Sequence, residues 1–396
     1  MRVYFLLLLC ILALCSRLTC AKEPIWRRLV KKWNPFATKE TGQASESEDG
    51  SSVDTAAELD SEIPIIDISG LVGPEATVES KKSVAAEIIK ACEEIGFFII
   101  KGHHVRSDII DNMWTATSDF FDLSTEYKDT WTTTNEAKYP FGYSGIGAEV
   151  LSAGKDAETK EDSKSLPDLK ELFSLGPSNP DSGFPTRVFP GQPSTFEEAW
   201  TVYYDELAEL AAKIMRGFAI GLGKDEFFFD QFLTHHASAV RALNYPAYEG
   251  YEAPPGQLRA SAHTDYGTIT ILKSGGPGLQ VSKDEVPPRW VDAPFVEDAF
   301  IVNLGDLMRR WSNDEWKSTL HRVVNPENPS QWARRQSIAF FHNPNRDAII
   351  EPLLGPNEQA KHEPIVAGDF LMQKHLSAIQ SAQEHKEAEV EVEATA

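Results

Sequence analysis

Apolar and polar residues follow two different patterns along the chain, and the change comes near residue 239. Before it, apolar residues recur at helical spacing and predict helices over residues 78–94, 105–121 and 196–222. After it, short runs typical of strands alternate with Gly, Pro, Asp and Asn, which predicts a closed or sandwiched β architecture. The pattern therefore predicts an α+β protein in which a helical N-terminal half packs on a C-terminal β-roll.

Two apolar segments of the N-terminal half are predicted strands. The segment IPIIDISGL (residues 63–71) precedes the helix at 78–94, and Gly96 ends that helix. The largely apolar run FFIIKGH (residues 97–103) follows as the second strand. The folded part of the chain is therefore expected to begin at about residue 63.

Residues 1–21 have the features of a secretory signal peptide. Arg2 gives a basic start, an apolar run of roughly a dozen residues follows, and small residues stand at Thr19 and Ala21. The run is shorter than the roughly 20 residues that span a bilayer, so an uncleaved anchor is the less favoured alternative. We expect the secretory pathway (endoplasmic reticulum lumen or secretion) or an organelle reached through it. The cytosol is the alternative if the leader does not function.

Residues 25–33 form a basic amphipathic pattern, with apolar residues at helical spacing opposite Arg and Lys. Such a helix can lie in a membrane interface, so peripheral membrane contact is one hypothesis and further targeting sequence is another. The alternative is a helix that packs on its own domain.

Acidic, polar segments flank the predicted folded part. Residues 37–61 are rich in Ser, Glu and Asp and read as a linker, and the acidic end of the chain is expected to be solvated. The predicted organisation is a signal peptide at 1–21, a basic helix and acidic disordered linker at 22–61, an N-terminal region at 62–190, a helix plus β-roll domain at 191–380, and an acidic tail at 381–396.

Composition narrows the class of partner. The 396 residues include 38 Lys and Arg against 60 Asp and Glu, which gives a net charge of −22. A field of this sign repels phosphate backbones, so nucleic acid is not an expected partner. Three of the four cysteines lie in residues 1–21, so a processed chain keeps only Cys92 and no disulfide framework is predicted.

The strongest chemical signal is His263-Thr264-Asp265. In a strand, residues i and i+2 point to the same face, so the imidazole and the carboxylate can converge. His321 lies farther along the β-rich half and is the candidate third ligand. Two histidines and one carboxylate form the facial triad of non-haem Fe(II) oxygenases, but the same set also suits zinc. From the residues alone, the metal therefore stays open.

A second constellation lies in the run RRQSIAFFHNP. On a strand, Arg335, Ser337 and Phe341 share one face. Arg335 offers a planar fork that binds a carboxylate, Ser337 adds a hydroxyl, and Tyr245 could add another. The alternative for Arg335 is a surface ion pair on an edge strand. Phe341 could line a substrate pocket, and the alternative for it is packing in the core. The implied ligand has one carboxylate held by the protein and a chelating end on the metal, as in 2-oxoglutarate.

The order and spacing of these motifs are similar to those of a known family. The matching segments are IPIIDISGL, GFFIIKGH, DLKELFSLG, LNYP, HTDYG, LQV, WVDAP, FIVNLGDLMRRWSN, STLHRVVNP and RQSIAFFHNPN. They span nearly all of the predicted folded part. The chain resembles the isopenicillin N synthase-like family of Fe(II)/2-oxoglutarate dioxygenases.

The resemblance implies a fold and a set of roles. The fold is a double-stranded β-helix (jelly-roll) core with a helical N-terminal region. The resemblance carries the Fe(II) ligands onto His263, Asp265 and His321. It implies that Arg335 and Ser337, together with Tyr245, bind the C5 carboxylate of 2-oxoglutarate. It implies no catalytic side chain beyond the metal centre.

The implied activity is oxidation, most simply hydroxylation, of a small organic substrate. Dioxygen is consumed and 2-oxoglutarate is converted to succinate and CO₂. Two alternatives stay open. Some family oxidases, such as the penicillin-forming and ethylene-forming enzymes, use no 2-oxoglutarate and can hold a substrate carboxylate on the Arg-x-Ser pair. The second alternative is a non-catalytic protein with the same fold that binds a small molecule, although the intact triad argues against it. The substrate itself, and hydroxylation versus desaturation or ring closure, stay open.

Overall fold

The computed structural model describes residues 62–132, 141–154, 166–179, 183–247, 253–283, 287–328, 332–378 and 380. The predicted signal peptide, the basic helix and linker at 22–61 and the acidic tail at 381–396 lie outside these residues. Within the described part, no helix is both long and apolar enough to cross a membrane.

The first half of the chain supplies helices and four strands. Its elements in chain order are β1 (Ile65–Asp67), α4 (Ser69–Val72), α5 (Val78–Glu94), β2 (Phe97–Lys101), α6 (Ser107–Phe121), α7 (Thr125–Asp129), β3 (Gly142–Ser144), η1 (Leu151–Gly154) and β4 (Glu171–Leu175). The helix predicted over 78–94 is confirmed, and Gly96 after it has a φ of +70°, where a Cβ would lie 2.2 Å from the Lys317 carbonyl oxygen. Only glycine fits that turn.

The second half begins with a long helix and continues mostly in strands. Its elements are α8 (Phe196–Gly221), η4 (Asp230–Phe232), β5 (Ala239–Tyr245), β6 (Ala260–His263), β7 (Ile269–Ser274), β8 (Leu279–Ser282), β9 (Trp290–Asp292), β10 (Phe300–Leu304), α9 (Asp306–Trp311), β11 (His321–Val323), β12 (Arg335–His342), β13 (Ile349–Ile350) and β14 (Ile365–Val366). Residues 367–378 are helical and follow β14 directly.

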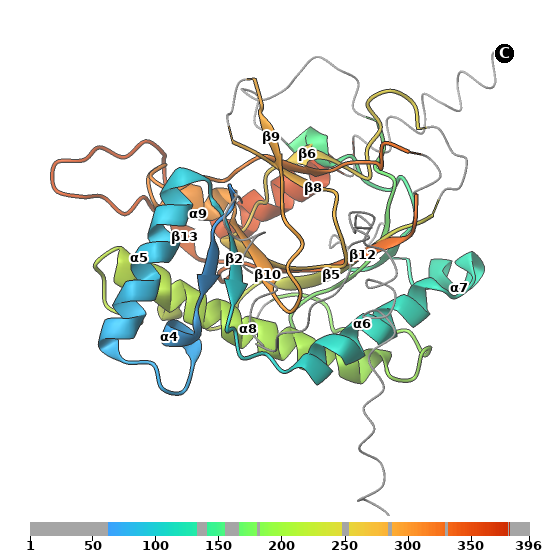
Figure 1. Ribbon diagram of the computed structural model, residues 1–396, viewed down its shortest axis with the longest axis horizontal. Helices are drawn as coiled ribbons and strands as arrows, with labels where there is room; N and C mark the ends of the chain where they lie inside the picture. Colours follow the sequence, from blue (N-terminus) through green and yellow to red (C-terminus); the bar gives the residue numbers. More distant parts are fainter. Residues whose placement is uncertain are drawn as a thin grey trace, which may run out of the picture. The chain divides into compact units, whose positions relative to one another are not determined.

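Two facing sheets form the predicted jelly-roll core. The major sheet has the order β1-β2-β10-β7-β12-β5-β4-β3, and the minor sheet has the order β6-β11-β8-β9. The minor sheet lies on one side of the major sheet, and α8 runs across the other side (Figure 1). Beyond the predicted pattern, the N-terminal half extends the major sheet at both edges, because β2 pairs with β10 and β4 pairs with β5.

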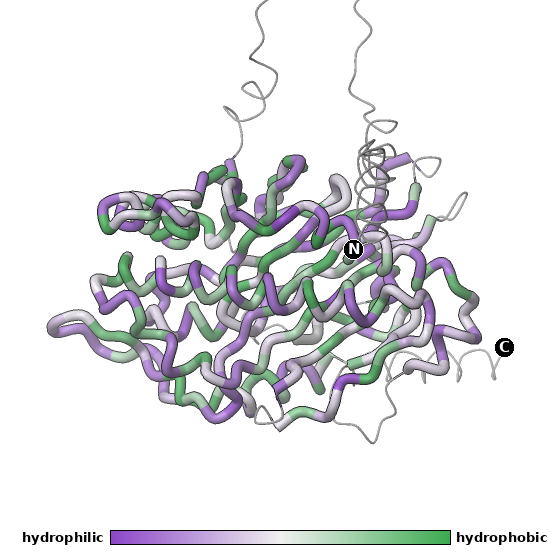
Figure 2. The backbone as a smooth tube through the Cα atoms, turned by 90° about the horizontal axis from the view of Figure 1, so that it is seen from below, coloured by the Kyte–Doolittle hydropathy of each residue, from purple (hydrophilic) through white to green (hydrophobic). Residues whose placement is uncertain are grey.

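The position of strand β2 explains why residues 97–100 are all apolar. Phe98 and Ile100 belong to the core between the major sheet and the helices, whereas Phe97 and Ile99 belong to the core between the two sheets. Because successive side chains of a strand point to opposite faces, a strand between two cores has no polar position. Elsewhere hydrophobic and hydrophilic residues alternate along the tube, as expected for elements with one face in water (Figure 2).

Candidate active site

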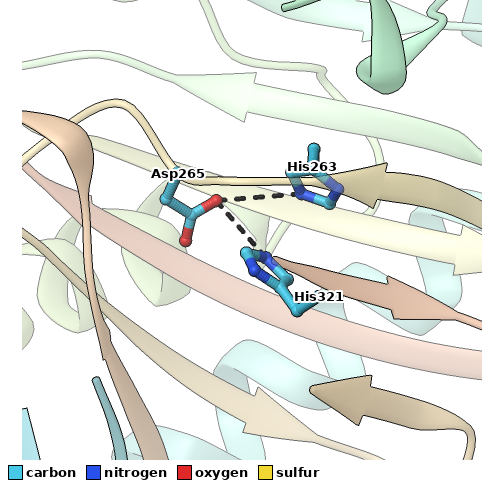
Figure 3. A group of neighbouring side chains, drawn as sticks. All are labelled: His263, Asp265 and His321. Carbon is cyan, nitrogen blue, oxygen red and sulfur yellow. Dashed lines mark ion pairs between the residues drawn. The ribbon is translucent and has the colours of Figure 1, made fainter. Parts of the chain in front are cut away.

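Strand pairing brings the two predicted histidine ligands together. His263 ends β6, His321 begins β11, and the two residues are direct partners in the antiparallel pair. Their ring centroids lie 4.3 Å apart. The Asp265 carboxylate points at both rings (Figure 3), with Oδ1 3.8 Å from His263 Nε2 and 3.6 Å from His321 Nε2. One ligand atom from each of the three residues lies within 4.8 Å of the others, as a shared metal ion requires.

The position of Asp265 has a different cause from the one expected from strand alternation. Strand β6 stops at His263, so Asp265 lies in the turn that follows and the i, i+2 rule does not apply to it. The turn is fixed by the backbone N–H of Asp306, which donates to the Asp265 carbonyl oxygen at 2.8 Å. The carboxylate is aimed by its own hydrogen bonds: Thr270 Oγ1 and Asn303 Nδ2 donate to Oδ2 at 2.5 and 2.7 Å. The other oxygen, Oδ1, therefore faces the two histidines.

Each histidine is oriented by a backbone carbonyl two residues earlier. The Nδ1 atoms of His263 and His321 lie 2.7 and 3.0 Å from the carbonyl oxygens of Ser261 and Thr319. A carbonyl can only accept, so each Nδ1 carries the proton that it donates and each Nε2 is free to bind a metal.

Burial and mutual charge set the protonation states of the three groups. Burial, with a further contribution from His321, lowers the pKa of His263 to about 3. Burial alone would raise the pKa of Asp265, but the facing His321 outweighs it and holds that pKa well below its usual range. Burial lowers the pKa of His321, yet the Asp265 carboxylate outweighs it and raises the pKa overall. The site therefore holds an ionised carboxylate and a neutral His263, and His321 is the imidazole whose proton the Asp265 carboxylate stabilises.

The second predicted constellation also assembles. Arg335 begins β12 opposite Tyr245 of β5, and its guanidinium lies 5.0 Å from the Tyr245 ring. Its Nη1 donates to Ser337 Oγ at 3.3 Å. Its Nη2 donates to Ser274 Oγ at 2.9 Å, a contact that the sequence analysis missed because it depends on the pairing of β12 with β7. Since β12 lies inside the sheet between β7 and β5, the edge-strand alternative for Arg335 is excluded.

The charge of Arg335 is not balanced by the described part of the protein. The residue is 6% exposed, and burial lowers its pKa. Its polar neighbours among the described residues are two serine hydroxyls, the Pro277 carbonyl oxygen and the Tyr245 phenol, and none of them is a carboxylate. A buried cation without a counter-charge is costly, so this position suits an anionic ligand.

A cavity of about 160 Å³ is lined by two of the three metal-ligand candidates, His263 and Asp265. Phe341 lines it, as expected from its place on β12. Further polar residues of the lining could not be predicted from the sequence; they include Glu149, Arg241, Tyr266, Asn343, Arg346 and His375. One wall comes from the helix at 367–378, whose Gly368, Leu371, Met372, His375 and Ala378 share a helical stripe. The stripe is visible in the sequence, but nothing local indicates that it faces a cavity rather than a core.

Comparison with known proteins agrees with this geometry. Residues 63–196 match the model of the non-haem dioxygenase in morphine synthesis N-terminal family, and residues 237–344 match that of the 2OG-Fe(II) oxygenase superfamily. The 2-oxoglutarate-dependent dioxygenase caaD of Aspergillus niger is 34% identical over 328 residues, covering 79% of this chain and 92% of the relative. The chain belongs to the 2OG-Fe(II) oxygenase superfamily.

Other members of the superfamily show the same relationship. Validamycin A dioxygenase of Streptomyces hygroscopicus subsp. limoneus is 30% identical, with 82% of this chain and 88% of the relative covered. A full-length Neurospora crassa protein solved in complex with alpha-KG and thymine has a TM-score of 0.69 at 32% identity, with 79% and 96% of the two chains covered. JOX2, solved with 2OG, Fe and JA, has a TM-score of 0.60 at 30% identity, covering 78% of this chain and 83% of JOX2.

Membership confirms the expected enzyme class and fold. This oxygenase depends on Fe(II), 2-oxoglutarate and dioxygen, and it oxidises a small organic molecule with release of succinate and CO₂. The donor set of two imidazoles and one carboxylate fits Fe(II), because it binds the ion on one face and leaves positions for ligands.

Proposed function

We propose that His263, Asp265 and His321 hold the Fe(II), and that Arg335, with Ser337 and Tyr245, binds the C5 carboxylate of 2-oxoglutarate. The observation that carries the second assignment is the buried Arg335 guanidinium with no carboxylate partner among the described residues. A bidentate contact from this fork supplies the missing negative charge and leaves the 2-oxo acid end of the molecule for the metal.

In the proposed reaction, one oxygen atom of dioxygen enters a C–H bond of the substrate and the other enters succinate as 2-oxoglutarate loses CO₂. The iron supplies dioxygen activation when bound. The chain supplies positioning: the carbonyls of Ser261 and Thr319 fix the two imidazoles, and Thr270 and Asn303 fix the carboxylate. Phe341 and the other apolar walls of the cavity hold the substrate and exclude water.

The test is turnover of 2-oxoglutarate by the anaerobically prepared protein, with succinate and dioxygen measured together. Removing a charge-assisted contact from a buried site typically costs about 2–5 kcal/mol, so Arg335→Gln should raise the 2-oxoglutarate KM by roughly 30-fold or more. Arg335→Lys should recover only part of the loss, because a point charge lacks the fork. Iron binding should survive in both variants. An unchanged 2-oxoglutarate KM in Arg335→Gln would contradict the assignment of the cosubstrate carboxylate to Arg335.

We also propose that residues 1–21 direct the chain into the secretory route and that residues 25–33 contact a membrane surface. The support is the pattern of charge and hydrophobicity described above. Mass spectrometry of the native N-terminus tests the first part, since an intact Met1 on a cytosolic protein would contradict it. Nucleic acid remains an unexpected partner on grounds of charge alone.

A further inference from the structure

Strand β6, which ends at the metal-ligand candidate His263, is irregular within its own sheet. It lies at the edge of the minor sheet, and β11 is its one strand neighbour among the described residues. The pairing register shifts between His263 and Ala260, so that Ser261 and Ala262 together lie opposite the single residue Arg322. Such a β-bulge disrupts the ladder of hydrogen bonds locally. Strand pairing alone therefore does not fix the backbone at Ser261.

The position of Ser261 matters because its carbonyl oxygen orients His263. His263 Nδ1 lies 2.7 Å from this oxygen. The contact determines which ring nitrogen carries the proton and which way the imidazole faces. A residue that fixes Ser261 therefore contributes to the metal site without touching it.

Asp168 binds Ser261 through two hydrogen bonds. Its Oδ1 accepts from the backbone N–H of Ser261 at 2.8 Å and from Ser261 Oγ at 2.7 Å. Its Oδ2 accepts from Lys170 Nζ at 2.6 Å and from the backbone N–H of Leu151 at 3.4 Å. The backbone N–H of Ser152 also donates to Ser261 Oγ, at 3.2 Å. Both carboxylate oxygens are thus used, and Ser261 is held through its N–H and its hydroxyl.

The burial of the Asp168–Lys170 pair favours a role in positioning over a role in stability. Each side chain is 1% exposed. Burying an ion pair costs desolvation free energy, and replacing such a pair by apolar side chains is often neutral or stabilising. Both residues belong to the segment DLKELFSLG, and neither lies among the candidate ligands of iron or 2-oxoglutarate. What the pair does contribute is a fixed acceptor for Ser261.

We propose that Asp168 is a positioning residue of the metal site, which fixes the bulge at Ser261 so that the Ser261 carbonyl oxygen orients the His263 imidazole. Lys170 holds the second oxygen of Asp168 and so keeps the first one directed at Ser261. The first half of the chain then determines the orientation of a metal ligand in the second half. This inference rests on the proposed function, because it takes His263 as a ligand of Fe(II).

Two matched double variants of the full chain test the acceptor of Asp168. Both carry Lys170→Met, so that neither leaves a buried lysine without Asp168, and Glu149 keeps Arg241 as its partner. Asp168→Asn retains an oxygen that can accept from Ser261, whereas Asp168→Leu has nearly the same shape and accepts nothing. Co(II) is the probe, because its visible absorption spectrum reports the geometry of its ligands.

The Asp168→Leu double variant should bind Co(II) about 10- to 100-fold more weakly than the wild type, the usual effect of losing a group that orients a metal ligand. Its spectrum at saturating Co(II) should also differ from that of the wild type, because His263 is no longer held in one orientation. The Asp168→Asn double variant should restore most of the affinity and the wild-type spectrum. A general loss of stability would not produce this difference between Asn and Leu.

Two further variants separate positioning from folding. Ser261→Ala removes only the Oγ contact, so it should fold and bind Co(II) more weakly than the wild type, though less so than the Asp168→Leu variant. Lys128→Met/Glu171→Leu removes another buried ion pair, whose side chains are 8% and 6% exposed and whose other recorded partners lie outside β6. Its Co(II) affinity should equal that of the wild type, whatever its Tm.

The outcomes distinguish this inference from the proposed function. Wild-type Co(II) affinity in the Asp168→Leu variant, or an equal loss in the Asn and Leu variants, would overturn the inference. If the Leu variant does not fold, wild-type affinity and spectrum in Ser261→Ala would overturn it. A wild-type protein that binds no Co(II), or that binds it equally well after His263→Ala, would instead contradict the ligand assignment of the proposed function.

Discussion

At the scale of single residues, the two oxygen atoms of Asp265 have separate tasks. Oδ2 is occupied by Thr270 and Asn303, and Oδ1 faces the histidines. The sequence predicted the three metal-ligand candidates but neither of these supporting residues, because both contacts depend on where β7 and β10 lie in the sheet. Groups that orient metal ligands typically contribute a factor of 10–100 in metal affinity.

We therefore expect Thr270→Val to weaken Fe(II) binding by about 10-fold or more while the fold is retained. Valine has the shape of threonine but cannot donate to Asp265. Thr268→Val is the matched control, because the Thr268 hydroxyl is equally buried and donates to the His342 carbonyl oxygen instead. Anaerobic titration of Fe(II) measures both variants. Equal iron affinity in the two would show that Thr270 does not support the metal site.

The buried Glu149 gives a prediction about pH. Burial alone would raise its pKa, but Arg241 and Lys170 outweigh burial and lower the pKa from 4.5 to about 2. A carboxyl group with a lowered folded-state pKa stabilises the protein above its unfolded pKa, and this stabilisation is lost as the pH falls through the folded value.

Glu149→Gln should accordingly lower the free energy of unfolding near neutral pH by about 3–5 kcal/mol, since it leaves the partly buried Arg241 without its carboxylate partner. The difference between variant and wild type should shrink below pH 4.5 and nearly vanish toward pH 2. Urea unfolding at a series of pH values measures it. A difference that does not depend on pH would contradict the ionised pair.

At the scale of elements, the sequence predicted individual helices and strands better than it predicted which of them lie side by side. The helix at 78–94 and the strand after it follow from apolar spacing and from Gly96, which are local signals. The approach of His321 to His263 is set by the pairing of β11 with β6, and no local pattern encodes that pairing. The helix at 367–378 was missed as a cavity wall for the same reason.

That helix is held over the cavity by Lys374. Its Nζ lies 3.3 Å from Asp306 Oδ2 and over the Tyr266 ring at 5.8 Å. We expect Lys374→Met to loosen the helix, because it leaves the buried Asp306 carboxylate without this cation. Hydrogen exchange of the amides in 367–378 should become faster, and the KM of the primary substrate should rise while 2-oxoglutarate affinity is retained. Unchanged exchange in this segment would show that other contacts hold it.

At the scale of the whole molecule, both halves of the chain build the same two cores. The major sheet takes β1–β4 from the first half and its remaining strands from the second. Phe97 and Ile99 fill the space between the sheets, against side chains such as Val281 and Ile301 from the second half. The predicted boundary at 190/191 therefore falls within a shared structure, although the first family model ends close to it, at residue 196.

The last prediction concerns what residues 191–396 do without the first half. Without β1–β4, the strands β10 and β5 would become unpaired edges of the major sheet. The space that Phe97 and Ile99 fill between the sheets would be empty. Unpaired strand edges and unfilled cores favour aggregation over folding. We expect residues 62–396 to give a cooperative thermal transition and bind Fe(II), and residues 191–396 to aggregate or to lack a transition in calorimetry. A soluble, cooperatively folding 191–396 that binds Fe(II) would show that the metal-binding half is an independent domain.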